Sequence, residues 1–256
     1  MNSVKSKKEI EILREGGQIL AAVLDRVIES VKPGRNAIEL DTLAEKRIRE
    51  GGGEPSFKGY KTARDIMPYP STLCVSVNDE VVHGFPAEEK ILKEGDVVGI
   101  DIGMKYKNLF TDMAKTIIIG EGNQEARRLV EATRKALEIG ISEARTGNTT
   151  GDIGAAIQAY VEAQGFGVVQ ELIGHGVGHK VHEDPEVPNW GKRGEGVRLE
   201  EGMVIAIEPM VTEKSPKIYL AEDHWTWKTK DGARAAHFEH TLAVTEKGAE
   251  ILTAIK

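Results

Sequence analysis

The chain has 256 residues, of which 40% are hydrophobic and 29% charged, the balance of an ordinary soluble protein. Its formal net charge of −7 and the absence of a Lys/Arg cluster argue against nucleic acid as the main partner, because neutralising phosphates requires a basic face. No apolar run approaches the ~20 residues of a membrane-spanning helix, and the N-terminus lacks a signal-peptide core, so we expect no membrane association. The single cysteine, Cys74, excludes an internal disulfide framework and favours a reducing, cytoplasmic location.

Two amphipathic helices are predicted in the first fifty residues. Ser6 and Glu9 form a capping-box pattern, and apolar residues follow at helical spacing until Pro33. A second helix begins at Asn36 and ends at the glycines from Gly51. Residues 54–72 are rich in Pro, Gly and Tyr, so we expect an irregular surface loop or lid there before a strand at 73–77.

Two aspartates lie in neighbouring predicted strands. Residues 97–102 and 112–119 are rich in β-branched side chains, and a short polar segment of hairpin length joins them. A hairpin symmetric about residues 106–107 would place Asp101 directly opposite Asp112, with Gly99 opposite Ala114. Two facing carboxylates repel each other, so we expect a divalent cation between them. The alternative is a pair of solvated aspartates at the mouth of an edge hairpin.

The second half of the chain repeats the first. One helix is expected from about residue 125 to 144, and a further helix follows a turn and runs to Gly165. Residues 92–101 then align without a gap on residues 199–208, which places Asp101 on Glu208. This repeat predicts a single domain, 1–256, made of two similar halves, about 1–120 and 121–256. Each half would supply carboxylates to one shared site.

Further metal-binding side chains follow the repeat. Residues 173–182 hold three histidines among glycines, a composition that we expect to bend tightly and expose the imidazoles. Glu239 lies in a predicted strand at 236–244. It is the second strand carboxylate of its half, after Glu208, as Asp112 is the second of its half, after Asp101. Four carboxylates and at least one histidine suit two divalent ions, and Mn, Fe, Co and Zn all remain open.

These motifs together resemble the bacterial type I methionine aminopeptidases. The resemblance covers residues 6–245, and its motifs are residues 74–84, Asp101 with Asp112, the Gly-His-Gly-Val-Gly of 174–178, and residues 182–185, 207–210 and 238–241. It implies the pita-bread fold, an α/β (α+β) architecture in which two pseudo-symmetric halves surround a central antiparallel-rich sheet with helices outside.

The resemblance also assigns roles to individual residues. It implies five metal ligands: Asp101, Asp112, His175, Glu208 and Glu239. Of these, Asp112 and Glu239 would bridge the two ions. His83 and His182 would hold the substrate and the tetrahedral intermediate, and Glu208 would carry a proton. Cys74, Tyr60, Tyr69 and Trp225 would line the pocket for the substrate side chain. His179, His224, His237 and His240 are expected at the surface or just outside the ligand set.

The implied activity is removal of the initiator methionine from nascent polypeptides with a small second residue, by metal-activated water attack on the peptide bond. This activity implies two partners, the N-termini of nascent peptides and the ribosome near its exit tunnel. We expect the protein to be a monomer. Two alternatives stay open: an Xaa-Pro aminopeptidase or prolidase, and a non-enzymatic binding relative of the fold. Two departures from the family bear on the pocket: a longer loop at Lys61–Met67, and His179 where the family usually has arginine.

Overall fold

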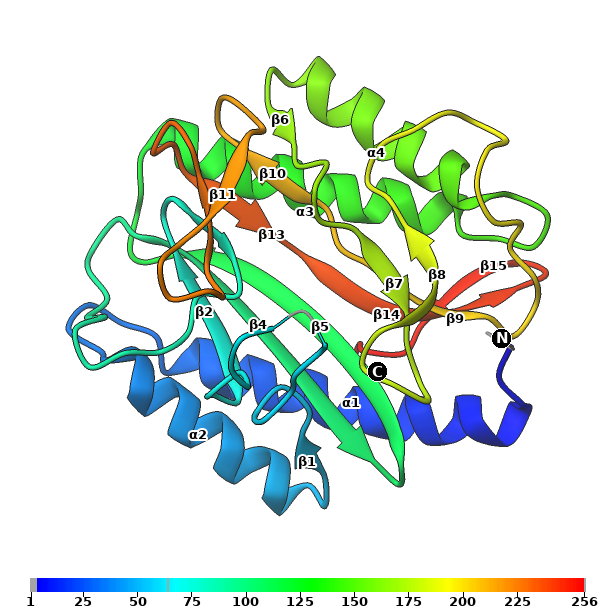
Figure 1. Cartoon of the computed structure of the whole chain (residues 1–256), viewed down its shortest axis with the longest axis horizontal. Helices are drawn as coiled ribbons and strands as arrows, with labels where there is room; N and C mark the ends of the chain where they lie inside the picture. The colour runs from blue at the N-terminus through cyan, green and yellow to red at the C-terminus, as the bar shows by residue number, and fades with distance from the viewer. Residues whose placement is uncertain (1–3, 64, 256) are drawn as a thin grey trace.

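The computed structural model describes residues 4–63 and 65–255. A nine-stranded sheet forms its centre, in the order β1-β4-β5-β14-β9-β7-β8, with β2 pairing β4 and β15 pairing β14. Every pairing in this sheet is antiparallel. Figure 1 shows the helices in two pairs on the outside, α1 with α2 along one half and α3 with α4 along the other. The predicted antiparallel-rich sheet with outer helices is thus confirmed.

The element bounds are as follows. The helices are α1 (Lys7–Glu29), α2 (Ala37–Glu50), α3 (Gln124–Glu143) and α4 (Thr150–Ala163). The central strands are β1 (Glu54–Pro55), β2 (Leu73–Val77), β4 (Val97–Tyr106), β5 (Leu109–Ile118), β7 (Gly174–Gly176), β8 (Glu183–Val187), β9 (Val204–Ile207), β14 (Glu239–Thr245) and β15 (Gly248–Ile251). Two small sheets flank them, β13 (Ala235–His237) with β10 (Met210–Thr212) and β6 (Gly167–Val168), and β11 (Ile218–Leu220) with β12 (Trp227–Thr229) and β3 (Glu80–Val82).

The helices begin where their capping residues predict. Ser6 accepts from the Glu9 amide and forms a capping box at α1, and the Asn36 side chain accepts from the Ile38 amide at α2. Thr149 forms a second capping box with Asp152 at α4. Burial of one apolar face then fixes each helix on the sheet. No helix among the described residues is long and apolar enough to cross a bilayer.

Each half of the sheet packs against its own hydrophobic core. One core joins α1 and α2 to β2, β4 and β5, and the other joins α3 and α4 to β9 and β14. The halves meet where β5 pairs with β14, and only two residue pairs are in register there, Ala114 with Glu239 and Met113 with His240. The strand pairing between the halves is therefore short, and a third core, in which Leu13 of α1 and Leu109 of β5 pack with Val204 of β9 and Ala243 of β14, also joins them.

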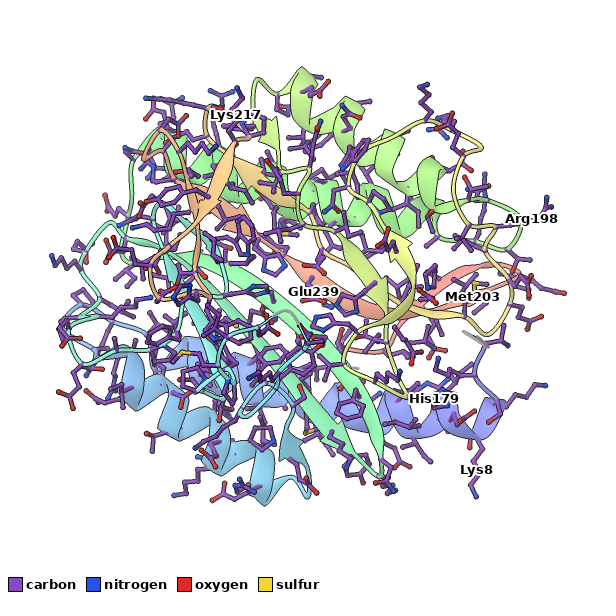
Figure 2. The ribbon with its side chains drawn as sticks, viewed as in Figure 1. Lys8, His179, Arg198, Met203, Lys217 and Glu239 are labelled. Carbon is purple, nitrogen blue, oxygen red and sulfur yellow. The ribbon has the colours of Figure 1, made fainter. Side chains whose placement is uncertain are left out.

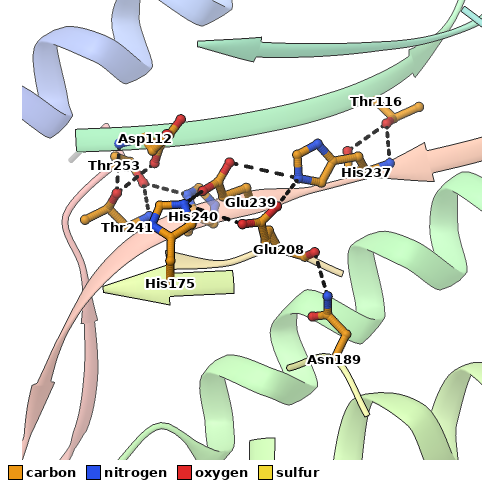
Figure 3. A network of polar contacts seen from close by, with 10 residues as sticks. All are labelled: Asp112, Thr116, His175, Asn189, Glu208, His237, Glu239, His240, Thr241 and Thr253. Carbon is orange, nitrogen blue, oxygen red and sulfur yellow. Dashed lines mark hydrogen bonds and ion pairs between the residues drawn. The ribbon is translucent and has the colours of Figure 1, made fainter. Parts of the chain in front are cut away.

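Two threonine side chains extend this seam on either side of the paired residues. Thr116 Oγ1 of β5 donates to the His237 carbonyl oxygen (2.7 Å) and accepts from the His237 amide (2.9 Å). Thr241 Oγ1 of β14 donates to the Asp112 carbonyl oxygen (2.8 Å) and accepts from the Asp112 amide (2.9 Å). Each threonine thus supplies, through its side chain, a donor and an acceptor that strand pairing would otherwise provide (Figure 3).

The register of the aspartate hairpin corrects our prediction. The turn is centred on Lys107 and Asn108, both with positive φ, one residue later than predicted. Asp101 therefore pairs with Ala114 and Asp112 with Gly103, so the aspartates are diagonal rather than directly opposite neighbours. They still share one face, because a two-residue change of partner preserves the alternation of side chains. A two-residue turn with positive φ matches the strand twist better than the longer connection that we assumed.

Candidate metal centre

The carboxylates gather at the seam between the two halves. Asp101 and Glu239 both pair in register with Ala114 of β5, one from each neighbouring strand, so the three side chains share a row on one face. Asp112, two residues before Ala114, lies on the same face. Glu208 directly follows β9, whose last residue pairs with β14 next to Glu239. The small Ala114 side chain leaves the space between the carboxylates free.

These carboxylates are buried at a cost that the protein alone does not offset. Asp101, Asp112 and Glu239 are 8%, 4% and 2% exposed, and one buried oxygen of each has no hydrogen-bond partner among the described residues. Burial raises the pKa of Asp101 to about 6. Burial first, and the neighbouring carboxylates second, raise the pKa values of Asp112 and Glu239 well above their usual range. Unpaired buried oxygens of this kind call for a cation.

His175 is the predicted nitrogen ligand, and it lies within this cluster. Its Nδ1 lies 2.9 Å from its neighbour Gly176's carbonyl oxygen, so Nδ1 carries the proton and Nε2 has a free lone pair. Nε2 lies 3.5 Å from Glu208 Oε1 and 4.0 Å from Glu239 Oε1 (Figure 3). Ligand atoms of Asp112, His175 and Glu239 all lie within 4.8 Å of one another. Metal bonds near 2 Å place ligand atoms about 3–4 Å apart, so these residues fit a divalent cation.

The glycines around His175 act differently from our expectation of a tight bend. Gly174–Gly176 is strand β7, held between β8 and β9, and His175 is mostly buried. A Cβ at Gly174 would lie 2.4 Å from the Ala206 carbonyl oxygen, and one at Gly176 would lie 2.1 Å from the Asp184 carbonyl oxygen. The glycines therefore permit close packing of three strands, which fixes the imidazole rather than exposing it.

A second histidine, His237, lies beside the cluster, which agrees with a position just outside the ligand set and excludes a position at the surface. It is 3% exposed, and its Nε2 lies 3.5 Å from Glu208 Oε2 and 4.0 Å from Glu239 Oε2. Glu208, His237 and Glu239 form a second group with ligand atoms within 4.8 Å of one another. Strand alternation gave a usable signal, because residues 237 and 239 fall on one face.

A pocket of about 480 Å³ opens beside the carboxylates. Its wall includes all four predicted pocket residues, Cys74, Tyr60, Tyr69 and Trp225, together with the five predicted metal ligands. Cys74 pairs in register with Asp101, which places the thiol side of the pocket next to the cluster. The Tyr69 and Trp225 rings meet edge to face at 5.2 Å. The pocket is thus apolar at one end and carboxylate-rich at the other.

The structure brings His83 and His182 to the same pocket. His83 follows β3 with a positive φ of 59°, and burial lowers its pKa to about 4. His182 lies at the mouth, where its Nδ1 is 2.7 Å from the Tyr60 hydroxyl and its ring is 4.4 Å from that of His175. Desolvation by the surrounding protein, and then His175 and His83, lower the pKa of His182. Neutral imidazoles at these two positions can donate one hydrogen bond each.

The other histidines lie outside this cluster. His179 Nε2 contacts Glu9 Oε1 of α1 at 2.7 Å, and Figure 2 shows it far from Glu239, which lies near the middle of the molecule. His240 is adjacent to Glu239 but bonds to Thr253 through Nδ1 (2.9 Å). His224 lines the pocket without belonging to either group of possible metal ligands.

The fold and the carboxylate-imidazole cluster define a metallopeptidase. The model of metallopeptidase family M24 matches residues 11–246, and the chain belongs to this family. Its relatives include methionine aminopeptidases from Aquifex aeolicus (48% identity, covering 97% of each chain) and Clostridium perfringens (45% identity, covering 99% of each). The crystal structure of methionine aminopeptidase from Thermotoga maritima matches with a TM-score of 0.94 and 44% identity, covering 98% of each chain. The resemblance drawn from the motifs is therefore confirmed.

Similarity to other peptidases of the fold is more distant. Prolidase from Pyrococcus horikoshii matches with a TM-score of 0.77 and 24% identity, and this chain covers 64% of its length. At that identity the match shows a common fold alone.

Proposed function

We propose that this protein is a metal-dependent methionyl aminopeptidase that removes N-terminal methionine when the second residue is small. One observation carries the proposal: a buried group of four carboxylates and an imidazole opens directly onto an apolar pocket. The full-length similarity to proteins named methionine aminopeptidase supports it. The natural substrates would be the N-termini of nascent polypeptides in the cytoplasm, with the ribosome near its exit tunnel as a further partner and the enzyme acting as a monomer.

Asp101, Asp112, His175, Glu208 and Glu239 would hold two divalent cations. Asp112 and Glu239 would bridge them, which is supported for Glu239 by its place in both groups of possible ligands and for Asp112 by its place beside Glu239 and His175. The donor set is rich in oxygen and poor in nitrogen and sulfur, so Mn, Fe, Co and Zn are the metals that suit it. When bound, such cations provide Lewis acidity that activates water and polarises the scissile carbonyl.

The protein's own side chains would bind the substrate and move the proton. Glu208 faces both the cluster and the pocket, so its carboxylate can take a proton from the attacking water and deliver it to the leaving amine. His83 and His182, kept neutral by their lowered pKa values, would donate hydrogen bonds to the oxygen of the tetrahedral intermediate. The Tyr60 hydroxyl holds the His182 ring in its orientation.

The shape of the pocket supports methionine as the first residue. Cys74, Tyr69 and Trp225 present thiol and aromatic surface, which suits an unbranched thioether. An apolar pocket distinguishes one methylene by only ~1–3 kcal/mol, so norleucine peptides should be cleaved at a measurable fraction of the methionine rate. Charged first residues would leave an unpaired charge against this surface and should be rejected.

The test is cleavage of a peptide panel by metal-reconstituted protein. Met-Ala, Met-Gly and Met-Ser peptides should be cut, and Met-Lys and Met-Phe peptides hardly at all, because the second side chain would face the crowded mouth near His83 and His182. Met-Phe turnover as fast as Met-Ala turnover would exclude the small-residue rule. Thr62 and Asp65 of the longer loop line the pocket, so a variant with a shortened loop would measure the effect of this loop on the second-residue preference.

An Xaa-Pro peptidase is the alternative, because the prolidase structures share the fold. Xaa-Pro peptides in the same panel distinguish the two activities. Faster release from Xaa-Pro than from Met-Ala peptides would favour the alternative. Lack of turnover on every peptide, in protein shown to contain two metal ions per chain, would favour a non-enzymatic relative.

A further inference from the structure

The proposed ligand set leaves one buried polar group of the metal centre unexplained. His237 Nε2 is buried and has no hydrogen-bond partner among the described residues. The polar atoms nearest to it in the cluster are carboxylate oxygens, Glu208 Oε2 at 3.5 Å and Glu239 Oε2 at 4.0 Å. The nitrogen therefore points at the metal centre without belonging to the ligand set inferred above.

His175 and His237 lie on opposite sides of the same two glutamates. His175 Nε2 is 3.5 Å from Glu208 Oε1 and 4.0 Å from Glu239 Oε1, and His237 Nε2 has the same two distances to the Oε2 atoms. Figure 3 shows the two imidazoles flanking the carboxylates. Each carboxylate oxygen of Glu208 therefore faces one imidazole, Oε1 that of His175 and Oε2 that of His237.

The two imidazoles differ in where the proton resides. The Nδ1 of His175 donates to a backbone carbonyl, so its Nε2 is free to bind a cation. In the described part of the chain no carbonyl or carboxylate accepts from Nδ1 of His237, and its Nε2 faces oxygens that only accept. The tautomer that satisfies the buried Nε2 carries the proton there, which makes His237 a donor.

We propose that His237 is a positioning residue of the metal centre: its Nε2–H donates to Oε2 of Glu208 and so keeps Oε1 facing His175, where a cation would be held. This inference rests on the proposed metal ligands. The 3.5 Å separation is long for a hydrogen bond, and such contacts commonly tighten only when the site is loaded. A carboxylate ligand generally has its second oxygen held in this way, and removing the holder typically costs 10–100-fold in metal affinity or activity.

Hydrogen bonds to the backbone of His237 fix the position of this residue. Thr116 Oγ1 bonds to both the amide and the carbonyl of His237, which fixes the residue where β13 ends, two residues before Glu239. The contact thus connects the seam between the two halves to Glu208, the proposed proton carrier.

Three variants of the full chain test the proposal. His237→Leu removes the donor and keeps a similar volume, and His237→Gln keeps an N–H donor without an imidazole. His240→Gln is the matched control, because His240 lies on the next strand along the chain and bonds to Thr253 instead of the cluster. Titration calorimetry of metal-stripped protein with Co²⁺ should show affinity lowered ~10–100-fold by His237→Leu. His237→Gln and His240→Gln should stay within about threefold of the parent by the same comparison.

Steady-state kinetics at saturating Co²⁺ on a Met-Ala peptide provide a second measurement. Because His237 would act on Glu208 and not on the methionine pocket, kcat should fall at least tenfold in His237→Leu while KM changes little. X-ray absorption of the Co²⁺-loaded parent and of His237→Gln should show the same imidazole content. If His237→Leu does not fold, His237→Met, an apolar side chain of similar volume, replaces it.

Three results would overturn the proposal. They are parental Co²⁺ affinity and kcat in His237→Leu, His237→Gln as impaired as His237→Leu, and loss of an imidazole ligand in His237→Gln, which would make His237 a ligand. Failure of the proposed function is seen separately, because the parent protein itself would then not cleave Met-Ala peptides.

Discussion

Asp112 is one of the buried carboxylates of the cluster. Its carboxylate lies beside Asp101 on the same face, and it also belongs to the group with His175 and Glu239. Its pKa is raised by burial and then by Asp101 and Glu208, which means that the surrounding protein alone disfavours the ionised form. We propose that Asp112 would contact both cations and Asp101 only one.

We therefore expect Asp112→Asn to lose more metal than Asp101→Asn. The amide keeps the size of the side chain but removes the charge that both cations would share. Metal content of each variant, purified without chelators and measured by plasma mass spectrometry, checks this. Equal metal content in the two variants and the parent would contradict a bridging position for Asp112.

The proton carrier requires a test that separates binding from catalysis. Glu208→Gln, once shown to contain as much metal as the parent, should lose ~10²–10⁴-fold in kcat, the usual contribution of general acid–base catalysis. Burst and steady-state rates on a Met-Ala peptide provide the measurement. Turnover near that of the fully loaded parent would exclude Glu208 from this role.

Burial of the His240 side chain should make the stability of the protein depend on pH. Burial lowers its pKa from 6.5 to about 4, so between these pH values the unfolded chain binds a proton that the folded protein does not. The free energy of unfolding should therefore fall as the pH falls from about 6.5 to 4, by up to about 3 kcal/mol from this group. The difference in unfolding free energy between parent and His240→Gln, followed by urea titration across this range, should shrink toward acid pH. A constant difference would show that His240 is not the group responsible.

At the scale of elements, the seam between β5 and β14 is the feature on which the site depends. Only two residue pairs are in register across it, and Thr116 and Thr241 extend it with side-chain hydrogen bonds to His237 and Asp112. Both threonines are buried, at 3% and 0% exposure, so water cannot replace them. Thr116 and Thr241 thus hold together the parts of β5 and β14 that carry Asp112 and Glu239.

Thr241→Val should lower the free energy of unfolding by about 1–3 kcal/mol, because it leaves the buried Asp112 amide and carbonyl without partners at nearly unchanged volume. Thr116→Val should have a similar effect through His237. Urea unfolding of the metal-free proteins provides the measurement, and Thr241→Ser, which keeps the hydroxyl, is the control. If valine and serine variants unfold alike, the hydroxyl bonds do not contribute as argued.

At the scale of the whole molecule, the proposed metal ligands come from both halves. Asp101 and Asp112 belong to the half packed on α1 and α2, while His175, Glu208 and Glu239 belong to the half packed on α3 and α4. Cations bound between them would therefore hold the two halves together and also offset the repulsion of the buried carboxylates.

Removing the metal should destabilise the whole fold. At a free metal concentration 100 times the dissociation constant, binding adds about 2.7 kcal/mol to the unfolding free energy. For a chain of this size that corresponds to roughly 5–10 °C in Tm. Calorimetry before and after chelation, and after Mn²⁺ is restored, checks the shift, and Asp112→Asn should show a much smaller one. An unchanged Tm in the parent would contradict a metal shared between the halves.

Local features of the sequence predicted most of the elements, while the repeat and the family motifs supplied the proposed ligand set. Capping residues such as Ser6 and Asn36 marked the helix starts, because they satisfy amides that have no other partner. The gapless repeat brought Asp101 and Glu208 into one site, and family motifs supplied His83 and His182, which spacing alone left among ordinary histidines. The tertiary structure decided the rest. The hairpin register depended on the positive φ values of Lys107 and Asn108, and the glycines beside His175 proved to serve strand packing. For His237 the sequence left open a position at the surface or just outside the ligand set, and the structure decided for the second. These outcomes depend on which backbone or side chain lies opposite a residue, and contacts between distant segments are set only when the two halves pack against each other.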